Sequence, residues 1–508
     1  MKFITRRFAH APEGTAALFF IQIFATLGFA VLYSTLVLYA TKHLQLGVKE
    51  ATALMGVFGA FNYGLHLFGG YLGGRFLSNR NLFVGGMALQ VFGCACIATG
   101  TLPLFYTGLA LFLTGSGLNV TCINMMLTQR FTPEDPRREG AFLWNYAGMN
   151  VGFFVGFSVA GHFQGTESYA SLFIFATLGN FVAIVLAFFN WTTLRDRNTP
   201  LLDKTPKQFR LRNLVGIGIL IGLVPVVWFM LQRPGGTELI IKTICAGVAV
   251  MLIYLTFRHP ERREQRNMTA YVILSVGSLM FWSLYQMAPS GLMLFAVNNV
   301  NLKIGNAAIA AVIGDAIQPQ WIQNINTVCI VVGGPLLAAL FTRMRERGWR
   351  IDIPKQFAAS LLLMAVAFLI LPLGIKLAGD GKSAFAWLFW SYVLQSTGEL
   401  LISPIGYAMI GKLAPRQYQG IMMGSWMLWT GLASLFAGDF SGMIPSPVGT
   451  TPAATNDGYA KLFTELGIGT LAVGIALVVL IPFLRKLITD KAEAVPAETM
   501  VATVVPIA

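Results

Sequence analysis

The chain has 508 residues, of which 55% are hydrophobic and only 11% are charged. This composition excludes a soluble globular protein of this size, because soluble domains carry roughly 25% charged residues. The formal net charge of +14 would suit a nucleic-acid-binding protein, but the positions of the charges along the chain argue for a membrane protein instead.

Apolar segments of roughly 20 residues recur along the whole chain, and each is long enough to cross a bilayer as a helix. We therefore expect an all-α membrane protein with about fourteen transmembrane helices. In chain order, the predicted spans are 15–40, 51–74, 82–101, 104–130, 139–162, 169–192, 212–232, 238–257, 269–288, 318–343, 357–376, 384–411, 418–443 and 460–484. The first span is of full length, which indicates a retained helix and not a cleaved signal peptide.

The basic residues are distributed unevenly between the two sides of this array. If the spans alternate in direction, 28 of the 36 lysines and arginines lie on the same side as the N-terminus. Positive charge concentrates on the cytoplasmic side of membrane proteins. We therefore expect a multi-pass membrane protein with both termini in the cytoplasm, in contact with the lipid bilayer and with no nucleic-acid partner.

Two polar stretches, at 190–213 and 258–267, divide the chain and leave two apolar spans between them. This pattern predicts the major facilitator fold, in which two six-helix bundles enclose a substrate site near mid-membrane. The predicted parts are an N-terminal bundle (1–200), a two-helix insertion with basic linkers (201–267), a C-terminal bundle (268–486) and a flexible cytoplasmic tail (487–508).

A glutamate, Glu399, lies near the middle of the span 384–411. An intramembrane acid is costly and is a functional candidate by default; the alternative is a structural acid that is paired with a neighbouring helix or is protonated and hydrogen-bonded. A low dielectric favours the neutral form, so Glu399 is able to bind a cationic amine, to carry a proton, or to do one after the other. Pro404 follows one turn later and is expected to kink the helix beside it.

His66 is the only histidine deep within a predicted span. Histidine titrates near neutral pH and suits proton exchange. A lone histidine in a helix is nevertheless more often a packed polar side chain that hydrogen-bonds to a backbone carbonyl, so His66 is the second candidate proton carrier after Glu399.

Amide and aromatic side chains form three pairs with a spacing of three or four residues, which places the members of each pair on one helix face. The pairs are Tyr146 and Asn150, Trp282 and Gln286, and Gln323 and Asn326. Such side chains either line a pocket or tie helices together. We expect Asn150 and Asn326 to line a pocket.

No Ser/His/Asp or Cys/His arrangement, metal-ligand cluster or phosphate-binding loop stands out in the sequence. The glycines at 115 and 117 lack the strand and helix context that a nucleotide site needs. The five cysteines lie in apolar spans, where cysteine usually behaves as a small hydrophobic residue. We therefore expect a protein that is not an enzyme and not an ATP-driven pump, without cofactor or metal.

Several segments resemble the proton-dependent oligopeptide transporter (POT/PTR) family of the major facilitator superfamily. Residues 398–438 resemble its tenth and eleventh core helices, including Glu399, Ser403-Pro404-Ile405-Gly406, Pro415, Gly420, Met422-Met423-Gly424 and Trp426. Residues 137–152 resemble its fifth-helix motif, 323–327 its QSxNP motif, and 69–80 its loop between helices two and three, although Gly74 replaces the usual aspartate. The two inserted helices are also found in bacterial members, so the resemblance covers nearly the whole chain.

The resemblance implies that Glu399, Asn150 and Asn326 hold the amino end of a substrate and that aromatic side chains shape the pocket. The candidate substrate-binding residues are Gln22, Thr26, Tyr63, Tyr146, Asn150, Trp282, Gln286, Gln323, Asn326, Glu399, Ser403 and Trp426, and the candidate proton carriers are Glu399 and His66.

The chain departs from the family at its charged positions. The first-helix motif ExxERFxYY aligns with QIFATLGFA, so that Gln22, Ala25 and Thr26 stand where two glutamates and an arginine are usual. The fourth-helix lysine falls on Val120, and the seventh-helix glutamate falls on Gln286. A substrate carboxylate would then be buried without a counter-charge, which is costly.

We therefore expect a monomeric secondary transporter of the bacterial inner membrane for a peptide-like or amine-bearing small molecule, with non-standard proton coupling and reduced recognition of carboxylates. One alternative is an ordinary proton-coupled importer of dipeptides and tripeptides. The other is a membrane sensor that binds a ligand without moving it, for which the short tail offers no signalling domain. The direction of transport is open.

Overall fold

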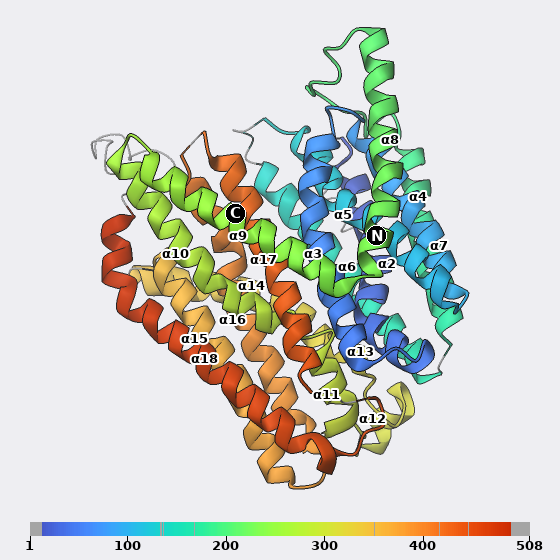
Figure 1. The fold of residues 1–508 in the computed structure, drawn as a ribbon, viewed down its shortest axis with the longest axis vertical. Helices are drawn as coiled ribbons and strands as arrows, with labels where there is room; N and C mark the ends of the chain where they lie inside the picture. Colours follow the sequence, from blue (N-terminus) through green and yellow to red (C-terminus); the bar gives the residue numbers. More distant parts are fainter. Residues whose placement is uncertain are drawn as a thin grey trace.

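The computed structural model describes residues 13–132, 135, 137–166, 168–349, 351–415, 417–444 and 447–488. The basic N-terminal residues, including Arg6 and Arg7, and nearly all of the predicted tail therefore lie outside the described residues. Within them the chain forms two six-helix bundles that lie side by side and an additional helix hairpin (Figure 1). The all-α membrane architecture and the major facilitator fold expected from the sequence are confirmed.

The N-terminal bundle and the C-terminal bundle each contain six long helices. The first consists of α2 (Thr15–Leu38), α3 (Val48–Leu72), α4 (Asn79–Ala98), α5 (Leu102–Thr128), α6 (Arg137–Gly165) and α7 (Tyr169–Phe189). The second consists of α10 (Arg262–Tyr285), α14 (Asn324–Glu346), α15 (Ile353–Ala378), α16 (Phe385–Leu413), α17 (Gln419–Gly442) and α18 (Pro452–Leu487). Short elements occupy the connections: η1 (Tyr39–His43), α11 (Gly291–Asn299), β1 (Val300–Asn301), α12 (Ala307–Ile313), α13 (Pro319–Ile322) and β2 (Ser383–Ala384).

Eleven helices of the described chain are long and apolar enough to cross a membrane. The remaining three of the predicted fourteen correspond to α3, α6 and α16, which have 25, 29 and 29 residues. They have the length to span a bilayer but are less apolar, because they carry many of the polar residues that face the centre of the molecule.

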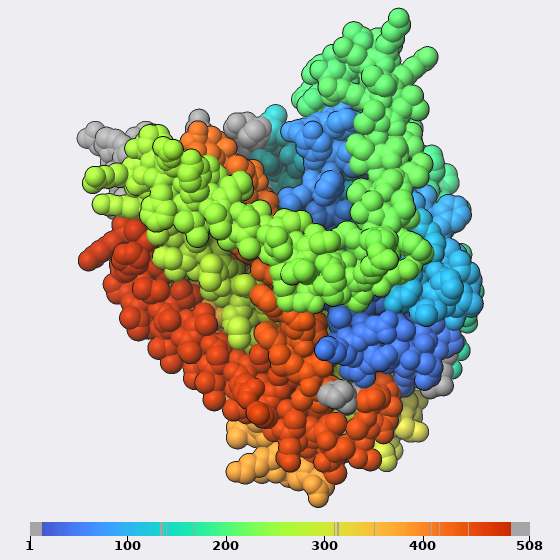
Figure 2. All heavy atoms as spheres, viewed as in Figure 1, coloured from blue at the N-terminus to red at the C-terminus, as the bar shows by residue number. Residues whose placement is uncertain are grey.

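The inserted hairpin consists of α8 (Pro206–Leu231) and α9 (Pro234–Arg258). A capping box between Thr205 and Gln208, followed by Pro206, fixes the start of α8. Helix α8 packs against α5, whereas α9 contacts α10 and α17 and runs obliquely across one face of the molecule (Figure 2). The hairpin thus touches both bundles and leaves most of its apolar side chains exposed to the surroundings, as expected for a lipid-facing element.

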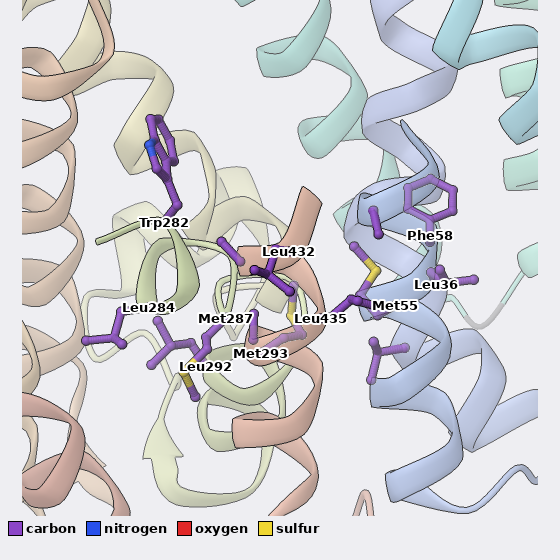
Figure 3. Packing of buried hydrophobic residues seen from close by; sticks show 14 of the residues in the cluster. Leu36, Met55, Phe58, Trp282, Leu284, Met287, Leu292, Met293, Leu432 and Leu435 are labelled. Carbon is purple, nitrogen blue, oxygen red and sulfur yellow. The ribbon is translucent and has the colours of Figure 1, made fainter. Parts of the chain in front are cut away.

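The bundles are joined at one end, which we call the closed end. One continuous apolar core contains residues of both bundles there, and Figure 3 shows Met55 of α3 beside Leu435 of α17. Small residues allow α3 and α17 to approach closely: a side chain on Gly56 would lie 2.9 Å from the Ser434 carbonyl oxygen, and one on Gly438 would lie 2.7 Å from that of Thr52.

Polar contacts between α6 and the segment α13–α14 reinforce the closed end. The Trp321 indole donates to the Ser158 carbonyl oxygen at 2.9 Å, and the Asn324 amide donates to the Ser158 hydroxyl at 3.0 Å. The Gln320 amide donates to Gln164 at 3.0 Å. These bonds connect the N-terminal bundle to the C-terminal one on the side opposite to the opening described next.

The bundles diverge at the other end, the open end, where α5 is followed by α6 and α16 is followed by α17 (Figures 1 and 2). A second apolar core lies towards this end and contains only residues of the N-terminal half and of α8. Leu143, Tyr146 and Tyr407 are large side chains that are exposed here, at 62%, 44% and 45% of their surfaces. No shared core closes this end among the described residues, so the interior is accessible from it.

The segment after α7 docks on the turn between α3 and α4. Gly74 in this turn has φ of +72°, a conformation that favours glycine, and its carbonyl oxygen accepts from the Leu201 N–H at 2.8 Å. Asp196 accepts from the backbone N–H of Asn79 at 3.0 Å, and the Asn79 side chain also donates to it. Burial raises the pKa of the Asp196 carboxyl despite these hydrogen bonds.

The structure corrects several predicted boundaries. Helix α18 has 36 residues and begins at Pro452, eight residues before the predicted span, because its first turns carry polar residues that hydropathy does not detect. The span 318–343 consists of α13 and α14, which meet at Gln323, and the short helices α11 and α12 were not predicted. Helix α16 continues through Pro404, and the kink expected there stays a prediction.

Candidate functional site

The interior of the molecule contains a cavity of about 680 Å³ between the two bundles. This volume is in the range of pockets for small ligands, which is roughly 300–1,000 Å³. All the candidate residues from the sequence line it, namely Gln22, Thr26, Tyr63, His66, Tyr146, Asn150, Trp282, Gln286, Gln323, Asn326, Glu399, Ser403 and Trp426. Side chains from both bundles therefore meet in one place near the middle of the helices.

Glu399 of α16 faces this cavity from the C-terminal bundle. Its Oε2 accepts a hydrogen bond of 2.7 Å from the Asn326 amide of α14, and that amide also donates to Ser396 at 3.0 Å. Tyr285, at the end of α10, lies close enough to the carboxylate to interact with it. Three helices of one bundle thus hold the acid in place, and its remaining lone pairs are available to a ligand.

Tyrosines surround the acid on its other sides. Tyr33 of α2, Tyr63 of α3 and Tyr146 of α6 lie close enough to Glu399 to interact with it electrostatically. These three tyrosines belong to the N-terminal bundle, so the two bundles face each other across Glu399. Aromatic faces and a carboxylate together form an environment that attracts a cation.

The charge of the cavity is one-sided. Glu399 is its one acidic residue and no lysine or arginine lines it among the described residues. The part of the chain that the structure describes also contains no ion pair to Glu399. The acid therefore faces the cavity, and no basic side chain of the described residues neutralises it.

Tryptophans close the cavity on the side of the C-terminal bundle. Trp426 of α17 packs against α16 where Gly406 leaves room: a side chain at position 406 would lie 2.3 Å from the indole ring. Trp282 of α10 is buried, and its indole nitrogen has no hydrogen-bond partner among the described residues. The Gln286 amide instead donates to the Thr430 carbonyl oxygen at 2.9 Å, which ties α10 to α17.

His66 of α3 lines the cavity on the opposite side. Its ring lies edge-on to Tyr63, with 6.1 Å between the ring centroids. Its Nε2 is buried and has no hydrogen-bond partner in the described part of the structure. No carbonyl oxygen among the described residues accepts from this nitrogen.

The remaining candidates bond mainly within their own helices. The Asn150 amide donates to the Tyr146 carbonyl oxygen at 2.9 Å, and the Gln22 amide donates to the Thr26 hydroxyl at 2.9 Å. The Gln323 amide nitrogen is buried without a partner among the described residues. The Gln323 nitrogen is therefore available to another partner.

Sequence reasoning missed several polar residues of the cavity wall. These are Tyr33, Asn62, Asn124, Asn145, Tyr285, Tyr392, Gln395, Ser396 and Tyr407. Some of them could have been predicted from helical spacing, since Asn124 lies four residues after Val120 and Tyr407 lies four residues after Ser403. Others, such as Asn145 beside Tyr146, could be placed only once the helix orientations were known.

Comparison with known proteins gives consistent matches. The sequence profile of the POT family matches residues 80–456. The chain is 28% identical over 496 residues to dipeptide and tripeptide permease A of Escherichia coli strain K12, covering 97% of this chain and 96% of the relative. It is 29% identical over 505 residues to the protein of the same name from Serratia proteamaculans, covering 97% and 96%.

Solved structures show the same fold. A crystal structure of a peptide transporter POT in complex with sulfate superposes with a TM-score of 0.81 at 23% identity, covering 94% of this chain and 96% of that one. A POT family transporter in complex with 5-aminolevulinic acid gives a TM-score of 0.79 at 20% identity, covering 93% and 97%. At these identities the likeness supports the fold alone.

Proposed function

The chain belongs to the POT family, so it is a membrane transporter and not an enzyme, and on that premise we propose that it is a secondary transporter for an amine-bearing, peptide-like small molecule without a free carboxylate. The observation that carries the proposal is the single acid of the cavity, Glu399, which faces no basic side chain among the described lining residues. A cationic amine would supply the missing positive charge through a charge-assisted hydrogen bond.

Asn326 and Tyr285 support this role for Glu399. The Asn326 amide donates to the carboxylate and Tyr285 lies beside it, which keeps the carboxylate oriented when no substrate is bound. Asn150 and Tyr146 belong to the facing helix α6 and are placed to contact the same amine. A ligand that contacts Glu399 on one bundle and α6 on the other would bridge the two bundles, as alternating access requires.

A free carboxylate on the substrate would find no cationic partner among the described residues of the cavity wall. Its removal from water without a counter-charge costs several kcal/mol, and the described cavity lining offers no guanidinium or ammonium group. Suitable substrates are therefore amidated or cyclic peptides, peptide-like natural products and other amines whose carboxyl group is absent or masked.

Proton linkage follows from competition at one carboxylate. A protonated Glu399 attracts a cation much less than an ionised one, so proton binding and amine binding oppose each other. His66, with its unpaired nitrogen at the opposite wall, is the second group able to exchange a proton. Neither residue occupies the first-helix positions at which the family usually carries its charges, so the coupling is of a non-standard kind.

The positive-inside pattern assigns the sides of the membrane. It favours a cytoplasmic location for the open end and both termini, and we infer on that basis that the structure corresponds to an inward-facing state. In the opposite state, the contacts of the closed end, including those of Trp321 with Ser158, would open while α5–α6 and α16–α17 approach each other.

Transport in proteoliposomes tests the proposal. An inward proton gradient should drive little uptake of labelled dialanine, whereas alanylalaninamide, which keeps the amine and masks the carboxylate, should be exchanged across the membrane. Glu399→Gln should abolish this exchange, and the Asp439→Asn variant, which removes an acid outside the cavity, should retain it.

Ordinary proton-coupled import of dipeptides and tripeptides is the second candidate function. It is favoured by the similarity to dipeptide and tripeptide permeases over nearly the full length of the chain. Robust dialanine uptake in the proton-gradient experiment would establish it and show that the proposed change of substrate is wrong.

A further inference from the structure

Three amide side chains meet in the cavity wall of the N-terminal bundle. The Asn145 amide nitrogen of α6 donates to Gln22 Oε1 of α2 at 3.5 Å and to Asn124 Oδ1 of α5 at 3.4 Å. All three residues line the cavity. We call Gln22, Asn124 and Asn145 the amide cluster.

The hydrogen bonds of the cluster determine how Asn145 is oriented. Its amide nitrogen faces the side-chain oxygens of Gln22 and Asn124. If the amide were rotated by 180°, the Asn145 oxygen would face these two oxygens and none of the three could donate a hydrogen bond. The Gln22 amide nitrogen is in turn engaged by Thr26 at 2.9 Å. The network therefore directs the donors of Asn145 towards its neighbours and leaves its Oδ1 as the free atom.

Asn145 Oδ1 is buried and has no hydrogen-bond partner in the described structure, and the whole residue is 7% exposed. A buried acceptor without a partner is costly, and a ligand that brings an N–H or O–H group to this wall removes the cost. A carboxylate has no hydrogen to donate and would add negative charge beside carbonyl oxygens.

Among the described residues that line the cavity, no lysine or arginine is present to favour a carboxylate at the cluster. Val120 lies one helical turn before Asn124 on α5 and also lines the cavity. The cluster is thus a neutral, polar surface on the N-terminal bundle, whereas Glu399 is the charged group of the C-terminal bundle.

We infer that the amide cluster is a second binding subsite that accepts an uncharged carboxamide of the substrate while Glu399 holds its amine. The inference rests on the proposed function, because it assigns the amine to Glu399. A carboxamide fits since its NH2 group donates to Asn145 Oδ1 and it carries no charge to desolvate. The preferred substrates are then amino-acid or peptide amides, whose two ends contact different bundles.

Isothermal titration of the purified full-length protein with four probes tests the inference. The probes are alanylalaninamide, dialanine, butylamine and 1,4-diaminobutane. We expect alanylalaninamide to bind about tenfold more tightly than each of the others, the ratio that corresponds to one satisfied buried hydrogen bond. Equal or tighter binding of dialanine overturns the inference, and so does tighter binding of the diamine, which would indicate a subsite for a second ammonium group.

Two variants locate the effect at the cluster. Asn145→Leu should remove the advantage of alanylalaninamide and leave the affinity for butylamine within about twofold; an equal loss for both probes contradicts a carboxamide subsite. Asn190→Leu, which removes an amide at the end of α7 outside the cavity lining, is the matched control and should keep the advantage.

Val120→Lys provides a gain of binding that does not depend on the stability of the Asn145 variant. An ammonium group beside the cluster should improve dialanine binding about tenfold and reverse the preference between the two peptides. An unchanged preference in a folded Val120→Lys protein contradicts the placement of the substrate's carboxyl end.

Glu399→Gln separates this inference from the proposed function. It should weaken binding of alanylalaninamide and butylamine alike, because both carry the amine. If butylamine binding depends on Glu399 but alanylalaninamide binds no more tightly than butylamine, the proposed carboxamide subsite is wrong and the assignment of the amine to Glu399 is supported. If butylamine binding does not depend on Glu399, the proposed function fails.

Discussion

Replacement of Glu399 by glutamine is the most direct perturbation of the cavity, because it removes the charge and keeps the size of the side chain. The glutamine oxygen can still accept from Asn326, whose amide lies 2.7 Å from the carboxylate in the wild type. The change therefore isolates the attraction between the acid and a cationic ligand.

The expected loss follows from two magnitudes. A hydrogen bond to a charged group contributes about 1.5–3 kcal/mol, and two charges at 4 Å interact by about 4 kcal/mol at an effective dielectric constant near 20. Part of this is offset by desolvation of the amine. We expect a loss of about 2–4 kcal/mol, which is roughly a 30- to 1,000-fold weaker affinity for butylamine.

Isothermal titration of purified wild type and variant with butylamine measures this loss. The matched control is Asp439→Asn, which removes an acid that contacts Lys242 at 3.0 Å on α9 and lies outside the cavity lining. The control should bind butylamine as the wild type does. Binding to the Glu399→Gln variant within twofold of wild type would refute the assignment of the amine to Glu399.

Three further predictions concern the support of the site and the fold. Asn326→Ala should weaken butylamine binding by about 1 kcal/mol, or roughly fivefold, because the carboxylate loses a hydrogen-bond donor that orients it. An unchanged affinity in isothermal titration would show that Asn326 does not contribute to the site. Gly56→Val should lower the melting temperature, since its side chain would meet the Ser434 carbonyl oxygen, with a cost of about 1–3 kcal/mol; an unchanged melting curve would contradict the close packing of α3 and α17. Asp196→Asn should flatten the pH dependence of stability, because burial raises the pKa of Asp196 above its unfolded value of 3.8. The stabilising contribution of the protonated carboxyl is then complete below pH 3.8 and is lost as the pH rises through the folded pKa. Parallel profiles of melting temperature against pH for the variant and the wild type would disprove this prediction.

The arrangement of the bundles relates the proposed site to transport. The closed end combines a shared apolar core with hydrogen bonds between α6 and α13–α14. At the open end, the apolar core of the described residues belongs to the N-terminal half and α8. A ligand that contacts Glu399 on one bundle and Asn145 on the other would draw the two together at the open end, which is the movement that alternating access needs.

The membrane fold could be predicted from the sequence because its physical cause is local. A bilayer requires about 20 consecutive apolar residues to form a helix with its backbone groups paired internally, and this pattern is visible without any tertiary contact. The start of α18 was misjudged for the same reason, since the polar residues after Pro452 extend the helix beyond the apolar segment.

Glu399 was also identifiable from the sequence alone, because a single acid within an apolar span stands out against its neighbours. The loss of the basic residues at Thr26 and Val120 was likewise readable by alignment with the family's motifs. Both observations concern which residues are present, and not where their side chains point.

The tertiary structure alone decided which side chains share the cavity and which atoms in it lack partners. Asn145 and Tyr285 are ordinary neighbours of recognised motif residues in the sequence, and the packing of α2, α5 and α6 was needed to bring Asn145 to Gln22 and Asn124. Helical periodicity orders residues around one helix axis but does not specify how helices rotate and tilt against each other. Those rotations result from contacts between distant segments, so the amide cluster and the open and closed ends emerged only from the folded chain.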